Sequence, residues 1–129
     1  MSEIAKGPRI QERTFQFSID VVSFCRKLDS KPGVARILGR QLLKSGTSIG
    51  ANVEEAQAAQ STADFVNKCS ISLKEARETI YWLRLLEATG EGSSADVSPL
   101  AQESDEISRI LGAIIVRTKN RRKKNGRSF

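Results

Sequence analysis

The side chains best suited to chemistry in this sequence are the cations near its end. Clustered lysine and arginine side chains contact phosphate groups and give an affinity for nucleic acid that depends little on base sequence. The formal net charge of the chain is +6 and arises in this segment, which contains no acidic residue. We expect a nucleic-acid-binding segment, or alternatively a solvated, solubilising tail. Its basic residues are Arg117, Lys119, Arg121, Arg122, Lys123, Lys124 and Arg127.

Groups that could support catalysis are scarce. The chain contains no histidine, which removes the commonest general base and the commonest transition-metal ligand. Cys25 and Cys69 lack the paired spacing of a zinc site, and we interpret them as reduced core residues. No nucleophile has a recognisable base and no cofactor-binding loop appears. We therefore expect no catalytic residue, no metal site, no cofactor and no enzymatic activity.

Four helices must position these groups. Apolar residues at helical spacing predict helices over 14–28, from Val34 through residue 56, from residue 62 to about 88, and from Ser98 into the basic segment. Hydrophobic residues make up 39% of the chain and charged residues 28%, as in globular proteins. Short connections favour antiparallel neighbours. The sequence predicts an all-α, up-down-up-down antiparallel four-helix bundle.

Local signals mark the ends of these helices. Pro32 and Gly33 should end the first helix, and Ser61 or Thr62 should cap the third. Gly90 suits a left-handed position after the third helix. Ser98 followed by Pro99 predicts the start of the fourth, because serine caps and proline fits the first helical position.

The chain length of 129 residues allows one domain. We expect an N-terminal extension at 1–13, the bundle at 14–118 and a basic tail at 119–129. The first residues lack the apolar stretch of a secretory signal, and no apolar run reaches the roughly 20 residues that span a bilayer. We therefore expect a cytoplasmic protein without a membrane partner.

Two glycines lie one turn apart in the second predicted helix. Gly46 and Gly50 each cost about 1 kcal/mol relative to alanine in a helix interior. Close approach of another backbone would explain them, and a kink or a backbone-lined ligand pocket is the alternative. We favour packing.

Two sequence motifs on adjacent predicted helices occur together with Phe65 and Lys68. They are SGTSIGANVEEA, which begins at Ser45, and ISLKEARETIYWL, which begins at Ile71. They closely resemble the small bacterial four helix bundle protein family, also known as intervening-sequence proteins of large-subunit ribosomal RNA. The resemblance covers about residues 14 to 118. This family is similar to the accessory protein of diversity-generating retroelements, whose members form five-subunit barrels and associate with nucleic acid and a reverse transcriptase.

The resemblance implies a homopentamer of four-helix protomers with no established enzymatic activity. It also implies RNA in preference to DNA, and a reverse transcriptase as a candidate partner. The positions that match the family motif are Ser48, Gly50, Asn52 and Glu55 on the second helix, and Lys74, Glu75, Glu78 and Trp82 on the third.

The motif side chains are interpreted as a polar network that fixes helix register and the oligomer interface. Asn52 and Glu55 lie three residues apart on one helical face, as do Glu75 and Glu78. We expect Lys74 or Arg77 to neutralise Glu54 or Glu55 across the interface. The alternatives are a weak Mg²⁺ site built from the carboxylates and base stacking on Tyr81 and Trp82.

Two functions of different class remain open. The first is nucleic-acid binding, chiefly through phosphate contacts of the basic segment. The second is a protein interaction scaffold without a nucleic-acid role. A second basic surface on the middle helices is a further alternative, built from Arg36, Arg40, Lys44, Lys68, Arg77 and Arg84.

Overall fold

The computed structural model describes residues 9–126, and all regular structure in that range is helical. The chain forms α2 (Ile10–Asp29), α3 (Val34–Gln57), α4 (Thr62–Ala88) and α5 (Ser94–Gly126). The predicted all-α class and the four helices are confirmed. Between residues 9 and 126, none of the helices combines the length and the apolar character that spanning a bilayer requires.

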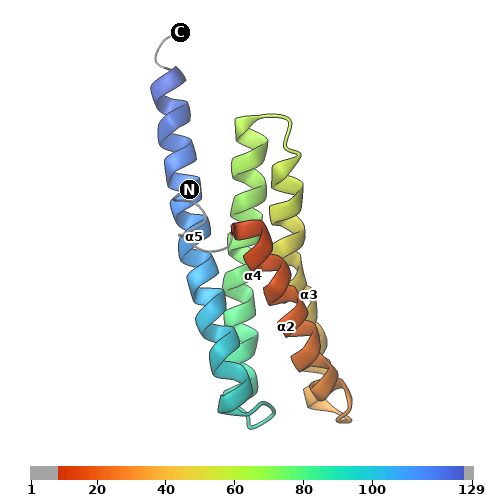
Figure 1. Cartoon of the computed structure of the whole chain (residues 1–129). Coiled ribbons are helices and arrows are strands. Elements are labelled where there is room, and N and C mark those ends of the chain that lie inside the picture. Colours follow the sequence, from red (N-terminus) through yellow and green to blue (C-terminus); the bar gives the residue numbers. More distant parts are fainter. Residues whose placement is uncertain (1–8, 127–129) are drawn as a thin grey trace.

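The helices lie side by side, with the α2–α3 and α4–α5 turns at one end and the α3–α4 turn at the other (Figure 1). Neighbours in sequence pack extensively, and α2 also makes a smaller contact with α5. The shorter α2 does not reach the α3–α4 turn, whereas α5 projects past it (Figure 1). We call the region around this turn the three-helix end; it comprises residues 56–65 and α5 from residue 114 onward. The remainder is the four-helix part.

A large apolar core fills the four-helix part. Side chains of all four helices meet there, and Leu42, Leu83 and Leu111 are completely buried. A separate cluster of Ala56, Cys69 and Ile115 lies where the three-helix end meets the four-helix part, with no α2 residue in it. Burial of apolar surface is the main favourable term in folding. The four-helix part therefore contributes most of the stability.

Buried hydroxyl groups lie between the core helices. Thr79 Oγ1 donates to Ser45 Oγ at 3.0 Å, and Ser72 Oγ donates to the Ile49 carbonyl at 2.8 Å. Ser104 Oγ donates to the Ala76 carbonyl at 3.0 Å. Among the described residues, every buried side-chain nitrogen and oxygen has a hydrogen-bond partner. These hydroxyl groups are satisfied within the fold and act as packing elements.

The two motif glycines let α2 approach α3. A Cβ atom at Gly50 would lie 3.2 Å from the Thr14 carbonyl oxygen, which confirms close backbone approach there. At Gly46 the neighbour is a side chain, because a Cβ atom would lie 2.9 Å from Cγ1 of Val21. Packing therefore accounts for both glycines, with backbone contact at only one of them.

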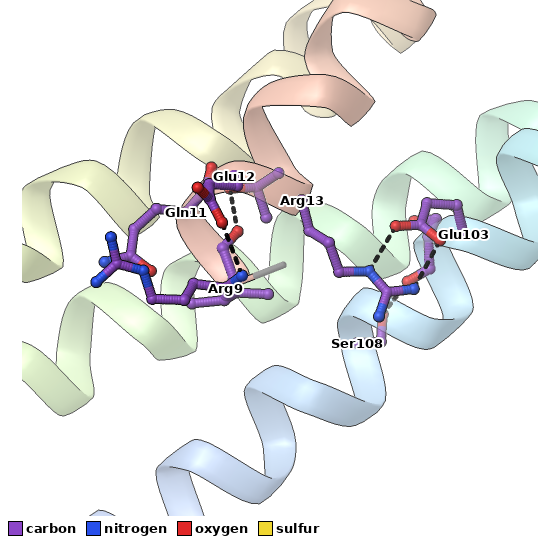
Figure 2. Close-up of polar contacts among 9 residues, drawn as sticks. Arg9, Gln11, Glu12, Arg13, Glu103 and Ser108 are labelled. Carbon is purple, nitrogen blue, oxygen red and sulfur yellow. Dashed lines mark hydrogen bonds and ion pairs between the residues drawn. The ribbon is translucent and has the colours of Figure 1, made fainter. Parts of the chain in front are cut away.

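An ion pair joins α2 to α5 across their limited contact. Arg13 Nε and Nη2 each donate to one carboxylate oxygen of Glu103 at 2.8 Å (Figure 2). This bidentate geometry is the strong form of an arginine–carboxylate contact. The hydrogen bond to Glu103 raises the pKa of Arg13 above its ordinary value. The pair holds α2 in place beside α5.

The first helix begins earlier than predicted. It starts at Ile10, where the Arg9 backbone N–H donates to Glu12 Oε1 at 3.0 Å (Figure 2). Residues 10–13, which the sequence assigned to the N-terminal extension, are therefore helical. Ile10 packs against the core, so tertiary contact supports this additional turn.

The predicted start of the fourth helix at Ser98 and Pro99 is wrong. The helix begins at Ser94, and Ser93 Oγ accepts from the Asp96 N–H at 3.2 Å. Pro99 lies inside the helix and forfeits one hydrogen bond, to the carbonyl of residue 95. The other helix-end signals are confirmed, since Ser61 Oγ accepts from the Asp64 N–H at 3.0 Å and Gly90 has a φ of 77°.

Candidate nucleic-acid interface

The basic segment continues α5 as a helix. α5 extends to Gly126, so this segment is helical through that residue. Its cations are exposed, and Figure 1 shows the helix projecting beyond the α3–α4 turn. Cations in the last turn also interact favourably with the helix dipole. The described members of the predicted site are Arg117, Lys119, Arg121, Arg122, Lys123 and Lys124, whereas Arg127 lies outside the described residues.

The cations surround the helix rather than occupying one stripe. At 100° per residue, Arg117, Arg121 and Lys124 share one face, while Lys119 and Lys123 share another. Like charges four residues apart destabilise an isolated helix. None of the ion pairs found within residues 9–126 involves these side chains. Their charge is therefore available to an external anion.

A pocket of about 550 Å³ lies where α5 passes the α3–α4 turn. Phe65 and Ile114 contribute apolar surface, and Arg117 and Arg121 contribute positive charge. Gln57, Gln60 and Ser61 add polar groups from the opposite side. Sequence reasoning missed this pocket because its two parts, residues 56–65 and 114–121, lie far apart along the chain. The spacing of the two arginines indicated a shared helix face but not what that face approaches.

The motif positions on α3 do not form one group. Ser48 Oγ donates to the Lys44 carbonyl at 2.6 Å, and Asn52 Nδ2 donates to the Ser48 carbonyl at 2.8 Å. Gly50 lies on the opposite side of α3, against α2. The Ser48 and Asn52 side chains thus bond to backbone carbonyls of their own helix. No hydrogen bond among residues 9–126 connects them to Glu75 or Glu78 on α4.

The expected partner of Glu55 is wrong. Lys68, rather than Lys74 or Arg77, lies 2.9 Å from the Glu55 carboxylate. Residue numbers rise on α3 as they fall on α4, with Ile49 opposite Ser72, which places Lys68 opposite Glu55. The hydrogen bond to Glu55 raises the pKa of Lys68.

The motif positions on α4 lie farther from the basic segment. Trp82 Nε1 donates to Glu78 Oε2 at 3.0 Å, and the Tyr81 ring meets Trp82 edge-on at 5.1 Å. Trp82 packs against the main core, which supports packing over base stacking. It lies 17 positions along α4 from Phe65, or about 26 Å at 1.5 Å per residue. Lys74 is exposed and Glu75 half-buried.

The structure gives less support to the two alternative sites, the second basic surface and the carboxylate metal site. Arg36 and Arg40 each lie 3.7 Å from the Asp29 carboxylate, and Lys68 is paired with Glu55, so the second basic surface is partly neutralised. No group of three or more acidic, cysteine or histidine side chains within residues 9–126 is placed to hold a metal ion. The free basic helix and its pocket are therefore the best candidate site.

Comparisons with known proteins agree with this architecture. A solved structure is 39% identical to this chain and superimposes with a TM-score of 0.79, covering 83% of this chain and 98% of its own. It is described as a protein with unknown function from the S23 ribosomal protein family of Bacteroides thetaiotaomicron VPI-5482. A search of curated proteins finds no significant match. A family model described as 23S rRNA-intervening sequence protein matches residues 8–113. The chain therefore belongs to the 23S rRNA-intervening sequence protein family.

Proposed function

We propose that this protein is a non-enzymatic oligomer that binds nucleic acid, RNA in preference to DNA, chiefly through phosphate contacts of α5. The observation that carries the proposal is the projecting helical segment from Arg117 to Lys124, whose cations are exposed and unpaired among the described residues. Phosphate groups would relieve the repulsion between its like charges. The preference for RNA is supported by the ribosomal RNA named in the family description.

Assembly is the second part of the proposal. We expect an up-down-up-down antiparallel protomer that forms a homopentamer, as the resemblance to retroelement accessory proteins implies. Exposed apolar side chains support self-association, including Phe15 at 68% and Ile37 at 63% relative exposure. Five basic helices in one assembly would bind a single nucleic acid multivalently. The same resemblance supports a reverse transcriptase as a partner. A cytoplasmic location is also part of the proposal.

The test compares the full chain with a variant that carries Arg121→Gln, Arg122→Gln, Lys123→Gln and Lys124→Gln. Both nuclease-treated proteins are titrated with a structured RNA at several salt concentrations, and the mass of each assembly is measured. Each phosphate contact contributes roughly 0.7–0.9 to the slope of log affinity against log salt, so the variant's slope should be shallower by about 3. Equal slopes at equal assembly mass would refute the phosphate-contact function.

A protein interaction scaffold is the second candidate. An apolar strip along the α2–α3 seam favours it, because Phe15, Ile19 and Leu43 are all exposed there. A groove of about 230 Å³ lies beside Phe15, between α2 and α3. If the full chain binds no RNA at low salt, this scaffold function replaces nucleic-acid binding.

A further inference from the structure

The pocket beside α5 offers two kinds of surface to one ligand. Arg117 and Arg121 lie one helical turn apart on its α5 side, and both are exposed. Phe65 is half-buried, packs against the small apolar cluster and still lines the pocket. A ligand that fills this space must therefore carry negative charge next to a flat or apolar group.

Nucleotides combine these two properties. Arginine binds phosphate oxygens through paired N–H groups, and aromatic side chains stack on bases with little regard to base identity. The pocket volume of about 550 Å³ lies within the roughly 300–1,000 Å³ range of small-molecule sites. Gln60 also borders the same space, and a glutamine amide can both donate to and accept from a base edge.

The pocket shape discriminates between nucleic-acid forms. A base within a duplex is covered on both faces by its neighbours, so it cannot enter a concave site without leaving the stack. An unpaired base can turn outward and pack against an aromatic side chain. The cations around α5 can follow a flexible single strand, whereas only some of them can face one side of a rigid duplex.

We infer that the pocket between the α3–α4 turn and α5 binds one unpaired nucleotide of a single-stranded nucleic acid, with its phosphate on Arg117 and Arg121 and its base on Phe65. This inference rests on the proposed nucleic-acid binding and specifies the form of the ligand. Contacts by Lys119, Arg122 and Lys123 then hold the flanking phosphates without regard to base pairing.

Two neighbouring arginines provide a matched test. Arg121 lines the pocket, and Arg122 carries the same charge on the same helix but does not line it. Affinities are measured for a labelled 12-nucleotide single-stranded RNA and for the same RNA annealed into a duplex. We expect the full chain to favour the single strand by about tenfold. Arg121→Gln should reduce that preference, whereas Arg122→Gln should weaken both complexes alike and preserve it.

A second pair of variants isolates the stacking surface. Phe65→Leu keeps an apolar side chain but removes the ring, whereas Phe65→Tyr keeps the ring. Stacking contributes about 1–3 kcal/mol per base, so Phe65→Leu should weaken single-strand binding roughly fivefold or more and leave duplex binding unchanged. Phe65→Tyr should retain the preference. Thermal unfolding of each variant checks that it is folded.

A single strand that contains 2-aminopurine gives a direct readout, because the fluorescence of this base depends on its stacking. A fluorescence change on binding to the full chain and to Phe65→Tyr, but not to Phe65→Leu, would support the site. If single strand and duplex bind equally, or if the two arginine variants behave alike, the pocket inference is overturned while nucleic-acid binding stands. If neither RNA binds, both proposals fail.

Discussion

The four-helix part and the three-helix end use polar side chains in opposite ways. In the four-helix part, buried hydroxyl groups such as those of Ser45 and Thr79 bond to one another and to backbone carbonyls. At the three-helix end, Arg117 and Arg121 are exposed beside an open pocket and have no acidic partner among the described residues.

This difference separates stability from binding. A buried polar group must be satisfied inside the fold, because an unsatisfied one costs about 1–3 kcal/mol. An exposed cation remains hydrated and contributes little to folding, so it can be placed wherever a ligand requires it. Changes in the four-helix part should therefore alter stability, and changes at the three-helix end should alter binding.

The largest expected effect comes from truncating a core side chain. Leu83 is completely buried in the four-helix part, and Leu83→Ala should lower the free energy of unfolding by about 2–5 kcal/mol. Ile114 is half-buried at the three-helix end, and Ile114→Ala should cost roughly 1–2 kcal/mol. Urea denaturation measures both. Equal losses would show that the two regions contribute equally to stability.

A smaller effect is expected from filling the glycine contact between α2 and α3. Gly46→Ala would place a Cβ atom 2.9 Å from a buried valine, so it should destabilise the protein by about 1–3 kcal/mol despite alanine's better helix propensity. The matched control is Gly112→Ala on α5, where a Cβ atom meets nothing within 4 Å. That variant should gain about 0.5–1 kcal/mol. A gain at both positions would contradict the tight α2–α3 contact.

The buried thiols should make stability depend on alkaline pH. Burial, with a contribution from Asp29, raises the pKa of Cys25 to about 12. Above about pH 9 the unfolded chain loses a proton that the folded chain keeps, so stability falls as pH rises, by up to about 1.4 kcal/mol per unit.

Unfolding free energies between pH 8.5 and 10.5 test this dependence. Cys25→Ala should flatten the decline more than Cys69→Ala does, because burial and the nearby Asp29 both raise the pKa of Cys25, whereas burial alone raises that of Cys69. Parallel pH profiles for the full chain and Cys25→Ala would show that folding does not raise the pKa of this thiol.

The smallest change in stability is expected at the basic helix. Replacing Arg121, Arg122 and Lys123 with glutamine should change the free energy of unfolding by no more than about 0.5 kcal/mol, since all three are exposed and none is paired with an acidic residue between positions 9 and 126. RNA affinity of the same variant should fall markedly. A large loss of stability would mean that these side chains serve the fold rather than a ligand.

Much of the fold was predictable because local signals act within a few residues. The start of α3 at Val34, the cap at Ser61 and the left-handed Gly90 all follow from short-range geometry. The misplaced start of α5 shows where such signals compete. Ser93 supplies a cap, through the Asp96 N–H, five residues before the expected cap at Ser98, and α5 continues through Pro99 although proline disfavours a helix interior.

The candidate site was predictable in part. Its cations were identified from charge alone, but the pocket required knowledge of which helix lies beside which turn. The sequence singled out Phe65 only through the family resemblance, and the fold places it near Arg117 and Arg121. The partner of Glu55 was missed for a related reason, because the choice among Lys68, Lys74 and Arg77 depends on the register between α3 and α4.

The ion pair between Arg13 and Glu103 has a consequence for the order in which the chain folds during synthesis. It joins residues 90 positions apart, whereas the larger helix contacts join neighbours in sequence. A ribosome adds roughly 5–20 residues per second, so α2 emerges at least several seconds before its partner on α5. During that interval α2 can pack on α3, but its outer side stays open until synthesis has passed Glu103. The first helix to be made therefore completes its packing only after the last helix has been synthesised.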